Sequence, residues 1–120
     1  MIEGRCHCGA ARFTLARPPA QVTDCNCSIC VRLGALWAYY PASDVCLSTP
    51  REALGSYRCN DRVLAFRFCA TCACTLFWEA VPGEAPAPEG VSPRMGVNVR
   101  MLVDFDLGAV EVVRFDGASM

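Results

Sequence analysis

The stretch Cys25-Asn26-Cys27-Ser28-Ile29-Cys30 places three thiols within six residues. Three thiolates suit one metal ion with a position left over, because soft thiolates favour zinc and zinc takes four tetrahedral ligands. A zinc site with three protein ligands and an open position is typical of catalysis, whereas four protein ligands are typical of structural sites. We therefore predict a chemically open zinc site at Cys25, Cys27 and Cys30.

Two further cysteine pairs can supply a closed site. Cys6-His7-Cys8-Gly9 lies near the start of the chain, and Cys69-Ala70-Thr71-Cys72 lies much later. Two close pairs separated by a long stretch can tie distant turns to one ion, and Gly9 can take the positive φ that a tight chelating turn often requires. We predict a structural zinc at these four cysteines, contributing on the order of 10 kcal/mol to folding. The alternative is four buried thiols without a metal.

The open site has three candidates for a fourth ligand, which are Cys46, Cys59 and Cys74. If none of them reaches the ion, water or a substrate thiolate takes the fourth position. Zinc in an open site holds a thiol as its thiolate at neutral pH, because coordination lowers the thiol pKa, and it can polarise a carbonyl as a Lewis acid. Together these properties suggest a reaction that joins a thiol to an aldehyde.

Composition and charge exclude several other classes of protein. A chain of 120 residues predicts one zinc-binding domain over residues 1–120, and its 53% of apolar residues favours a globular fold. All 11 cationic residues are arginine, against 12 acidic residues, and this balance without a basic run argues against nucleic acid as the partner. Because we find neither a membrane-spanning apolar stretch nor a signal peptide, we expect a soluble, cytoplasmic protein without a membrane partner.

The ten cysteines have two explanations, a disulfide framework or metal ligation. Thiols stay reduced in the cytosol, where clustered cysteines usually bind metals or carry out chemistry. In an extended Cys-x-Cys segment the sulfurs are also poorly placed for an unstrained disulfide. We therefore expect the clustered cysteines to bind metal, and we interpret Cys46 and Cys59 as small core residues.

The rest of the chain predicts a mainly β fold of short strands. A helical turn is expected over Ser28–Leu33, ended by Gly34. Residues 81–93 contain four prolines and indicate an exposed loop that could close over a site as a lid. The predicted strands cover residues 11–16, 21–24, 36–40, 45–47, 56–58, 63–68, 75–78, 94–103 and 109–115.

Several residues near these motifs have a structural interpretation beside a functional one. His7 and Asn26 each stand between two ligand cysteines, so in an extended segment they point towards solvent. Ser28 can cap the helical turn that follows it. Asn98 and Arg100 lie on one face of a predicted strand and are candidate contacts for a substrate carboxylate, although a surface ion pair is the commoner role of such an arginine. Four aromatic residues are predicted to lie in the core rather than to form a substrate platform: Trp37, Tyr39, Phe77 and Trp78.

At these residues the chain resembles the glutathione-dependent formaldehyde-activating enzyme family, the S-(hydroxymethyl)glutathione synthase-like proteins. The order and spacing of the matching segments fit over about residues 4–115. These segments are Cys6-His7-Cys8-Gly9, Cys25-Asn26-Cys27-Ser28-Ile29-Cys30 with Arg32 and Gly34, Phe68-Cys69-Ala70-Thr71-Cys72, and Thr75-Leu76-Phe77.

The resemblance implies a fold of short, twisted antiparallel sheets stapled by zinc and related to methionine-R-sulfoxide reductase B. It implies that Cys6, Cys8, Cys69 and Cys72 hold the structural zinc, and that glutathione binds at the zinc of the other three cysteines. The activity it implies is adduct formation between glutathione and formaldehyde, which is carbon–sulfur lyase chemistry.

Three positions depart from the usual pattern of that family. Val31 stands where a basic residue is common, Ala73 where glycine is usual, and Cys74 where serine or threonine is more usual. Ala73 is expected to strain its turn, because alanine tolerates positive φ poorly. Cys74 could reach a zinc ion or resolve a disulfide.

Our prediction is a protein with two zinc ions per chain, whose open zinc binds a small thiol and promotes its reversible addition to an aldehyde. One rival is a non-catalytic zinc scaffold that carries glutathione or a partner protein, which would bind thiols without accelerating the reaction. A second rival is a thiol redox enzyme using Cys72 and Cys74, which would need a reductant and would survive loss of the open zinc.

Overall fold

The computed structural model describes residues 1–58, 64–81 and 94–119. Its elements are short strands joined by turns, with one α-helix among the described residues, α1 (Ser28–Leu33). The strands are β1 (Ile2–Arg5), β2 (Arg12–Leu15), β3 (Gln21–Cys25), β4 (Trp37–Pro41), β5 (Val45–Leu47), β6 (Leu54–Arg58), β7 (Leu64–Cys69), β8 (Thr75–Ala80), β9 (Arg94–Asn98) and β10 (Glu111–Phe115). The predicted mainly β class is confirmed, and β1 is a strand that was not predicted.

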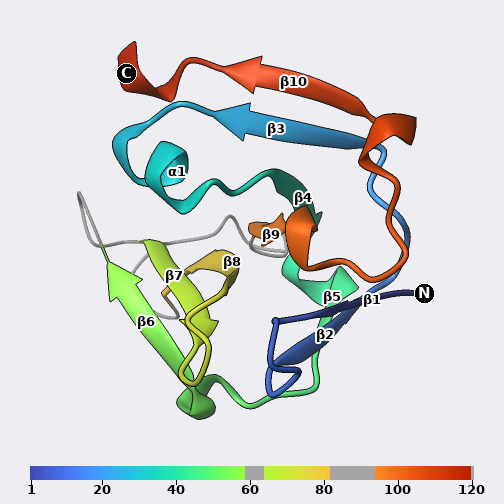
Figure 1. Cartoon of the computed structure of the whole chain (residues 1–120), viewed down its shortest axis with the longest axis vertical. Coiled ribbons are helices and arrows are strands. Elements are labelled where there is room, and N and C mark those ends of the chain that lie inside the picture. The colour runs from blue at the N-terminus through green and yellow to red at the C-terminus, as the bar shows by residue number, and fades with distance from the viewer. Residues whose placement is uncertain (59–63, 82–93, 120) are drawn as a thin grey trace.

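The strands form a sheet of three, in the order β1-β2-β5, and a sheet of seven, in the order β10-β3-β4-β9-β8-β7-β6 (Figure 1). Neighbouring strands are antiparallel except for β10 and β3, which run parallel with Glu111 opposite Gln21 and Phe115 opposite Cys25. This register brings the end of β10 beside the first cysteine of the 25–30 stretch. The larger sheet is therefore mixed, whereas we expected only antiparallel pairing.

Alternation along β4 separates two hydrophobic clusters on the two faces of the larger sheet. Ala38 and Tyr40 belong to a main core to which both sheets contribute, through residues such as Phe13 and Val97. The preceding residue Trp37 instead packs in a second cluster that also holds Cys25, Cys30, Ala35 and Phe66. Because successive side chains of a strand point to opposite faces, one aromatic strand supports both the core and the environment of the cysteines.

The helix α1 has the predicted bounds and ends at Gly34, whose φ of 64° is left-handed. Its cap is not Ser28, as predicted, but Cys27, whose sulfur accepts a hydrogen bond from the Cys30 N–H. Cys27 takes this role because its backbone is extended and its side chain lies three residues before that N–H. A thiol of the predicted open site thus also fixes the start of the helix.

Two turns show the expected backbone geometry. Gly9 has a φ of 81°, as predicted for a chelating turn, and Ala73 has a φ of 66°. Alanine is strained in the left-handed region because its Cβ crowds the following carbonyl oxygen. Ala73 therefore adopts the left-handed conformation at a cost in backbone strain.

Other sequence predictions met different outcomes. The strand predicted over 94–103 ends at Asn98 and continues as a 3-10 turn, Val99–Met101. Cys46 is exposed rather than part of the core, because its register opposite Thr14 turns it to the outer face of the smaller sheet. Cys59 and nearly all of the predicted lid, residues 82–93, lie outside the described residues. No helix in the described ranges is long and apolar enough to cross a membrane.

Candidate metal centres

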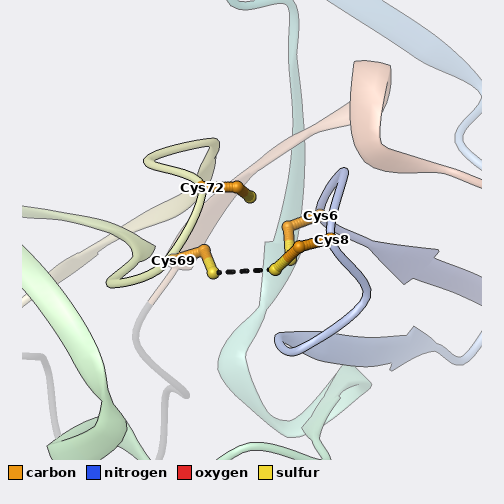
Figure 2. A group of neighbouring side chains, drawn as sticks. All are labelled: Cys6, Cys8, Cys69 and Cys72. Carbon is orange, nitrogen blue, oxygen red and sulfur yellow. Dashed lines mark hydrogen bonds between the residues drawn. The ribbon is translucent and has the colours of Figure 1, made fainter.

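Four cysteines from two tight turns converge between the two sheets (Figure 2). The turn from β1 to β2 carries Cys6 and Cys8, Cys69 is the last residue of β7, and Cys72 lies in the turn from β7 to β8. The Sγ atom of Cys8 lies 3.6 Å from that of Cys6 and 3.6 Å from that of Cys69, and all four sulfurs lie within 4.8 Å of one another. Thiolates about 2.3 Å from a tetrahedral zinc lie about 3.8 Å apart, so this four-cysteine cluster fits zinc.

Backbone groups hold the four-cysteine cluster in shape. The Ala11 N–H donates to the Cys6 sulfur at 3.3 Å, and the Thr71 N–H donates to the Cys69 sulfur at 3.4 Å. Hydrogen bonds from the backbone N–H groups of Cys8 and Cys74 lower the pKa of Cys72 to about 5. These hydrogen bonds favour the thiolate form of Cys72, and a metal ion in the cluster would link turns of the two sheets.

The other group, Cys25, Cys27 and Cys30, is built locally at the junction of β3 and α1. Its three sulfurs lie within 4.8 Å of one another, and Cys25 and Cys30 are buried while Cys27 is partly exposed. This three-cysteine group also fits a zinc ion, with three ligands at compatible spacing.

The surroundings of Cys27 and Cys30 shift their thiol pKa values in opposite directions. Burial and the neighbouring Cys27 sulfur raise the pKa of Cys30 to about 12, against a lowering effect of the Trp37 indole. The Trp37 Nε1–H donates to the Cys30 sulfur at 3.2 Å. Burial also acts to raise the pKa of Cys27, but hydrogen bonds from the Cys30 and Ile29 backbone and from neighbouring sulfurs lower it overall. Trp37 therefore orients Cys30, a role that the sequence did not reveal.

Neither described candidate for a fourth ligand joins the three-cysteine group. Cys46 lies on β5 in the other sheet, and Cys74 lines a cavity together with Cys6 of the four-cysteine cluster. Among the residues that the structure describes, the group therefore offers three sulfurs.

An aromatic cavity of about 300 Å³ opens beside the three-cysteine group. Among its lining residues are Cys25, Cys27, Cys30, Trp37, Tyr39, Phe66, Trp78, Arg94 and Phe115. Of the four aromatic residues predicted to lie in the core, Phe77 is buried in the main core and Trp37 in the second cluster, where it also lines this cavity. Trp78 is partly buried and Tyr39 is exposed, and both line the cavity, so the core prediction is wrong for Tyr39.

The C-terminal segment closes one side of the three-cysteine group. The Asn26 side chain donates to Asp116 Oδ1 at 3.0 Å and accepts from the Ala118 N–H at 2.9 Å. Gly117 packs so closely that an added Cβ would lie 2.7 Å from the Cys25 sulfur. Asn26 is exposed, as predicted, yet it anchors this segment. In the sequence, the sign of this role was an amide side chain, which can both donate and accept hydrogen bonds, placed between Cys25 and Cys27.

Asn98 and Arg100, the predicted candidate contacts for a substrate carboxylate, are not among the described residues that line this cavity, and their substrate role stays a prediction. Asn98 is buried, with its Nδ2 donating to the Thr75 carbonyl at 2.8 Å and its Oδ1 accepting from the Arg100 N–H at 3.2 Å. The Arg100 Nε donates to the Gly34 carbonyl at 2.8 Å. The side chains of Asn98 and Arg100 thus form hydrogen bonds with backbone groups at the point where β9 ends. His7 is exposed, as predicted.

Comparison with known proteins shows the family of this chain and a similar solved structure. A crystal structure of a Rhodobacter sphaeroides protein matches with a TM-score of 0.71 and 29% sequence identity, covering 92% of this chain and 99% of that one. The sequence model of a family described as glutathione-dependent formaldehyde-activating enzyme matches residues 1–99, a range that contains both cysteine groups. The chain belongs to the glutathione-dependent formaldehyde-activating enzyme family.

Proposed function

We propose that the chain is a zinc enzyme that promotes the reversible addition of a small, glutathione-like thiol to a formaldehyde-like aldehyde. The observation that carries this proposal is the three-cysteine group beside an open aromatic cavity, with three sulfurs and no fourth ligand among the described residues. Family membership supports the same reaction class.

Cys25, Cys27 and Cys30 would hold the ion, and they act as ligands rather than as nucleophiles. Zinc bound with an open position keeps an incoming thiol as its thiolate at neutral pH and can polarise the aldehyde carbonyl. Trp37 orients Cys30 through its indole N–H, as an outer hydrogen bond commonly does for a metal ligand. Asn26 keeps the C-terminal segment against one side of the site.

The reaction balances without an oxidant or a reductant. The thiol loses its proton, its sulfur attacks the aldehyde carbon, and a C–S bond forms while the carbonyl π electrons move to oxygen. The oxygen takes up a proton, so the product is a hemithioacetal with a hydroxyl group. The reverse reaction breaks the C–S bond and is carbon–sulfur lyase chemistry.

In the same proposal, Cys6, Cys8, Cys69 and Cys72 hold a second zinc that has no part in the chemistry. The cysteines saturate a tetrahedral ion, so no position is left for a substrate. Its effect is to fasten the turns of the two sheets to each other.

The test is the rate of adduct formation from glutathione and formaldehyde, measured above the spontaneous rate. We expect acceleration by the zinc-loaded protein, loss of this acceleration in Cys27→Ser, and no loss in Cys46→Ser, which changes an exposed cysteine of the other sheet. A wild-type protein that binds glutathione without any acceleration would contradict the proposal and favour a non-catalytic scaffold. Activity that needs a reductant and persists in Cys27→Ser would favour a thiol redox enzyme.

A further inference from the structure

Five of the described residues that line the cavity beside the three-cysteine group are aromatic. The Trp37 and Phe66 rings lie 6.0 Å apart, and the Tyr39 and Trp78 rings lie 5.9 Å apart. At the rim, Tyr39 is 38% exposed and Phe115 is 45% exposed. Exposed apolar surface gathered at one concave site marks a binding surface, because a ligand that covers it gains the hydrophobic free energy.

The backbone of β9 makes room for the Trp78 ring in the cavity wall. Gly96 of β9 lies opposite both Tyr39 and Trp78 in the sheet register. A Cβ added to Gly96 would lie 2.0 Å from the Trp78 indole nitrogen, so the indole lies directly over the backbone of β9. The absent side chain of Gly96 thus lets Trp78 lie flat as a platform.

One cation, Arg94, stands on these aromatic faces. Its guanidinium carbon lies 4.5 Å from the centre of the Tyr39 ring and 5.8 Å from that of the Trp78 ring. A stacked guanidinium still presents N–H donors at its edge, in a geometry that matches a carboxylate. No Asp or Glu is among the described residues that line the cavity, so the cation has no carboxylate partner within it.

Glutathione carries two carboxylates, an ammonium group and two amides. The described lining offers one cation and no carboxylate to pair with the ammonium, and polar groups buried without partners cost free energy. An apolar group bearing a single carboxylate matches both the aromatic walls and Arg94.

Resting on the proposed function, we propose that the thiol held in this cavity is an aromatic or similarly apolar thiol with one carboxylate, rather than a tripeptide. Its ring contacts Tyr39, Phe66 and Trp78, its carboxylate pairs with Arg94, and its sulfur faces the three cysteines. The reaction remains the balanced addition of this thiol to an aldehyde.

The cavity provides its own probe, because the chain has two tryptophans and both Trp37 and Trp78 line it. The zinc-loaded protein is titrated with 3-phenylpropanoate, which has the ring and the carboxylate but no thiol, while tryptophan fluorescence is recorded. We expect saturable quenching, with affinity about 10-fold lower in Arg94→Gln, since a hydrogen bond between charged groups is lost. The uncharged 3-phenylpropanamide should bind Arg94→Gln and the wild type alike.

Arg17→Gln is the matched control. Arg17 stacks over Tyr40 with its guanidinium carbon 5.4 Å from the ring centre, and the side chain of Tyr40 lies on the other face of β4. This variant should bind 3-phenylpropanoate as the wild type does. Absence of quenching, or equal loss of affinity in Arg17→Gln and Arg94→Gln, would overturn the proposal.

A second measurement separates this proposal from the proposed function. In the cobalt-substituted protein, the cysteine ligands already give thiolate-to-cobalt charge-transfer absorption, and a thiol that binds the open metal position adds a further band to the difference spectrum recorded against the thiol-free protein. We expect this band at a lower concentration of 3-phenyl-2-sulfanylpropanoate than of glutathione, by about 10-fold or more. Bands from both thiols with tighter binding of glutathione would overturn the aromatic preference alone. Quenching by 3-phenylpropanoate without a band from either thiol would overturn the proposed function and leave the cavity assignment standing.

Discussion

The four-cysteine cluster and the three-cysteine group are both built from cysteines, but they differ in how the chain brings the sulfurs together. In the first, sulfurs that are 61 residues apart, such as those of Cys8 and Cys69, meet between turns of two sheets. In the second, the sulfurs come from six consecutive residues at one strand–helix junction and lie beside an aromatic cavity. Four ligands from distant parts of the chain would saturate a zinc ion and constrain the fold, whereas three ligands from one short stretch would leave a coordination position free for chemistry. We therefore expect their variants to have opposite effects on stability and on thiol binding.

The largest expected effect is the loss of stability in Cys69→Ser. Serine is a poor zinc ligand, so the turn from β7 to β8 loses its link to the turn from β1 to β2. The zinc contribution to folding is on the order of 10 kcal/mol in zinc-finger peptides, and the variant should lose several kcal/mol or fail to fold. Thermal unfolding followed by circular dichroism measures the change.

The control for this prediction is Cys46→Ser, which changes an exposed cysteine and should stay within about 0.5 kcal/mol of the wild type. If Cys69→Ser were as stable as Cys46→Ser, the structural role of the four-cysteine cluster would be wrong.

A smaller effect, confined to the three-cysteine group, is expected from Gly117→Ala. The new Cβ would lie 2.7 Å from the Cys25 sulfur and 3.1 Å from the Cys27 Cβ, so either the C-terminal segment or Cys25 must move. Overpacking of this kind costs about 1 to 3 kcal/mol and should lower the affinity of this site for zinc. Competition with a chromophoric chelator measures that affinity.

Gly108→Ala is the comparison for Gly117→Ala, because its added Cβ would approach only the Asp106 Oδ1 atom, at 3.3 Å. Equal zinc affinities of the two variants would show that the C-terminal segment does not constrain the cysteines.

Trp37→Phe should have the smallest effect, a loss of about 10-fold in zinc affinity at the three-cysteine group. The substitution removes the N–H that donates to the Cys30 sulfur and keeps an aromatic ring in its place. Because a merely structural change could also lower stability, the cobalt charge-transfer spectrum is the decisive readout. A spectrum identical to that of the wild type would exclude Trp37 as the residue that positions Cys30.

The features that the sequence predicted correctly depend on residues close together in the chain. The cysteine spacing, the helical turn ended by Gly34 and the positive φ of Gly9 are local features, and each appears where expected. The face of a residue in a short strand depends on register instead. Cys46 is exposed because of its pairing with β2, a contact that local patterns do not encode.

The contacts around the three-cysteine group were the hardest to predict, because they join distant parts of the chain. The C-terminal segment reaches Asn26 because β10 runs parallel to β3. Asn98 and Arg100 share a face only if the strand continues, and it ends at Asn98. Pairing across such distances is set by the packing of the whole fold rather than by local preference.

The most direct test of the division between the two sites is elemental analysis of zinc in protein purified without added metal. It compares the wild type with Cys27→Ser and Cys69→Ser. We predict close to two zinc ions per wild-type chain, one for each cysteine group, and close to one in a Cys27→Ser protein that remains folded. A single zinc in the wild type, lost with Cys69→Ser and kept in Cys27→Ser, would contradict the open site and with it the proposed reaction.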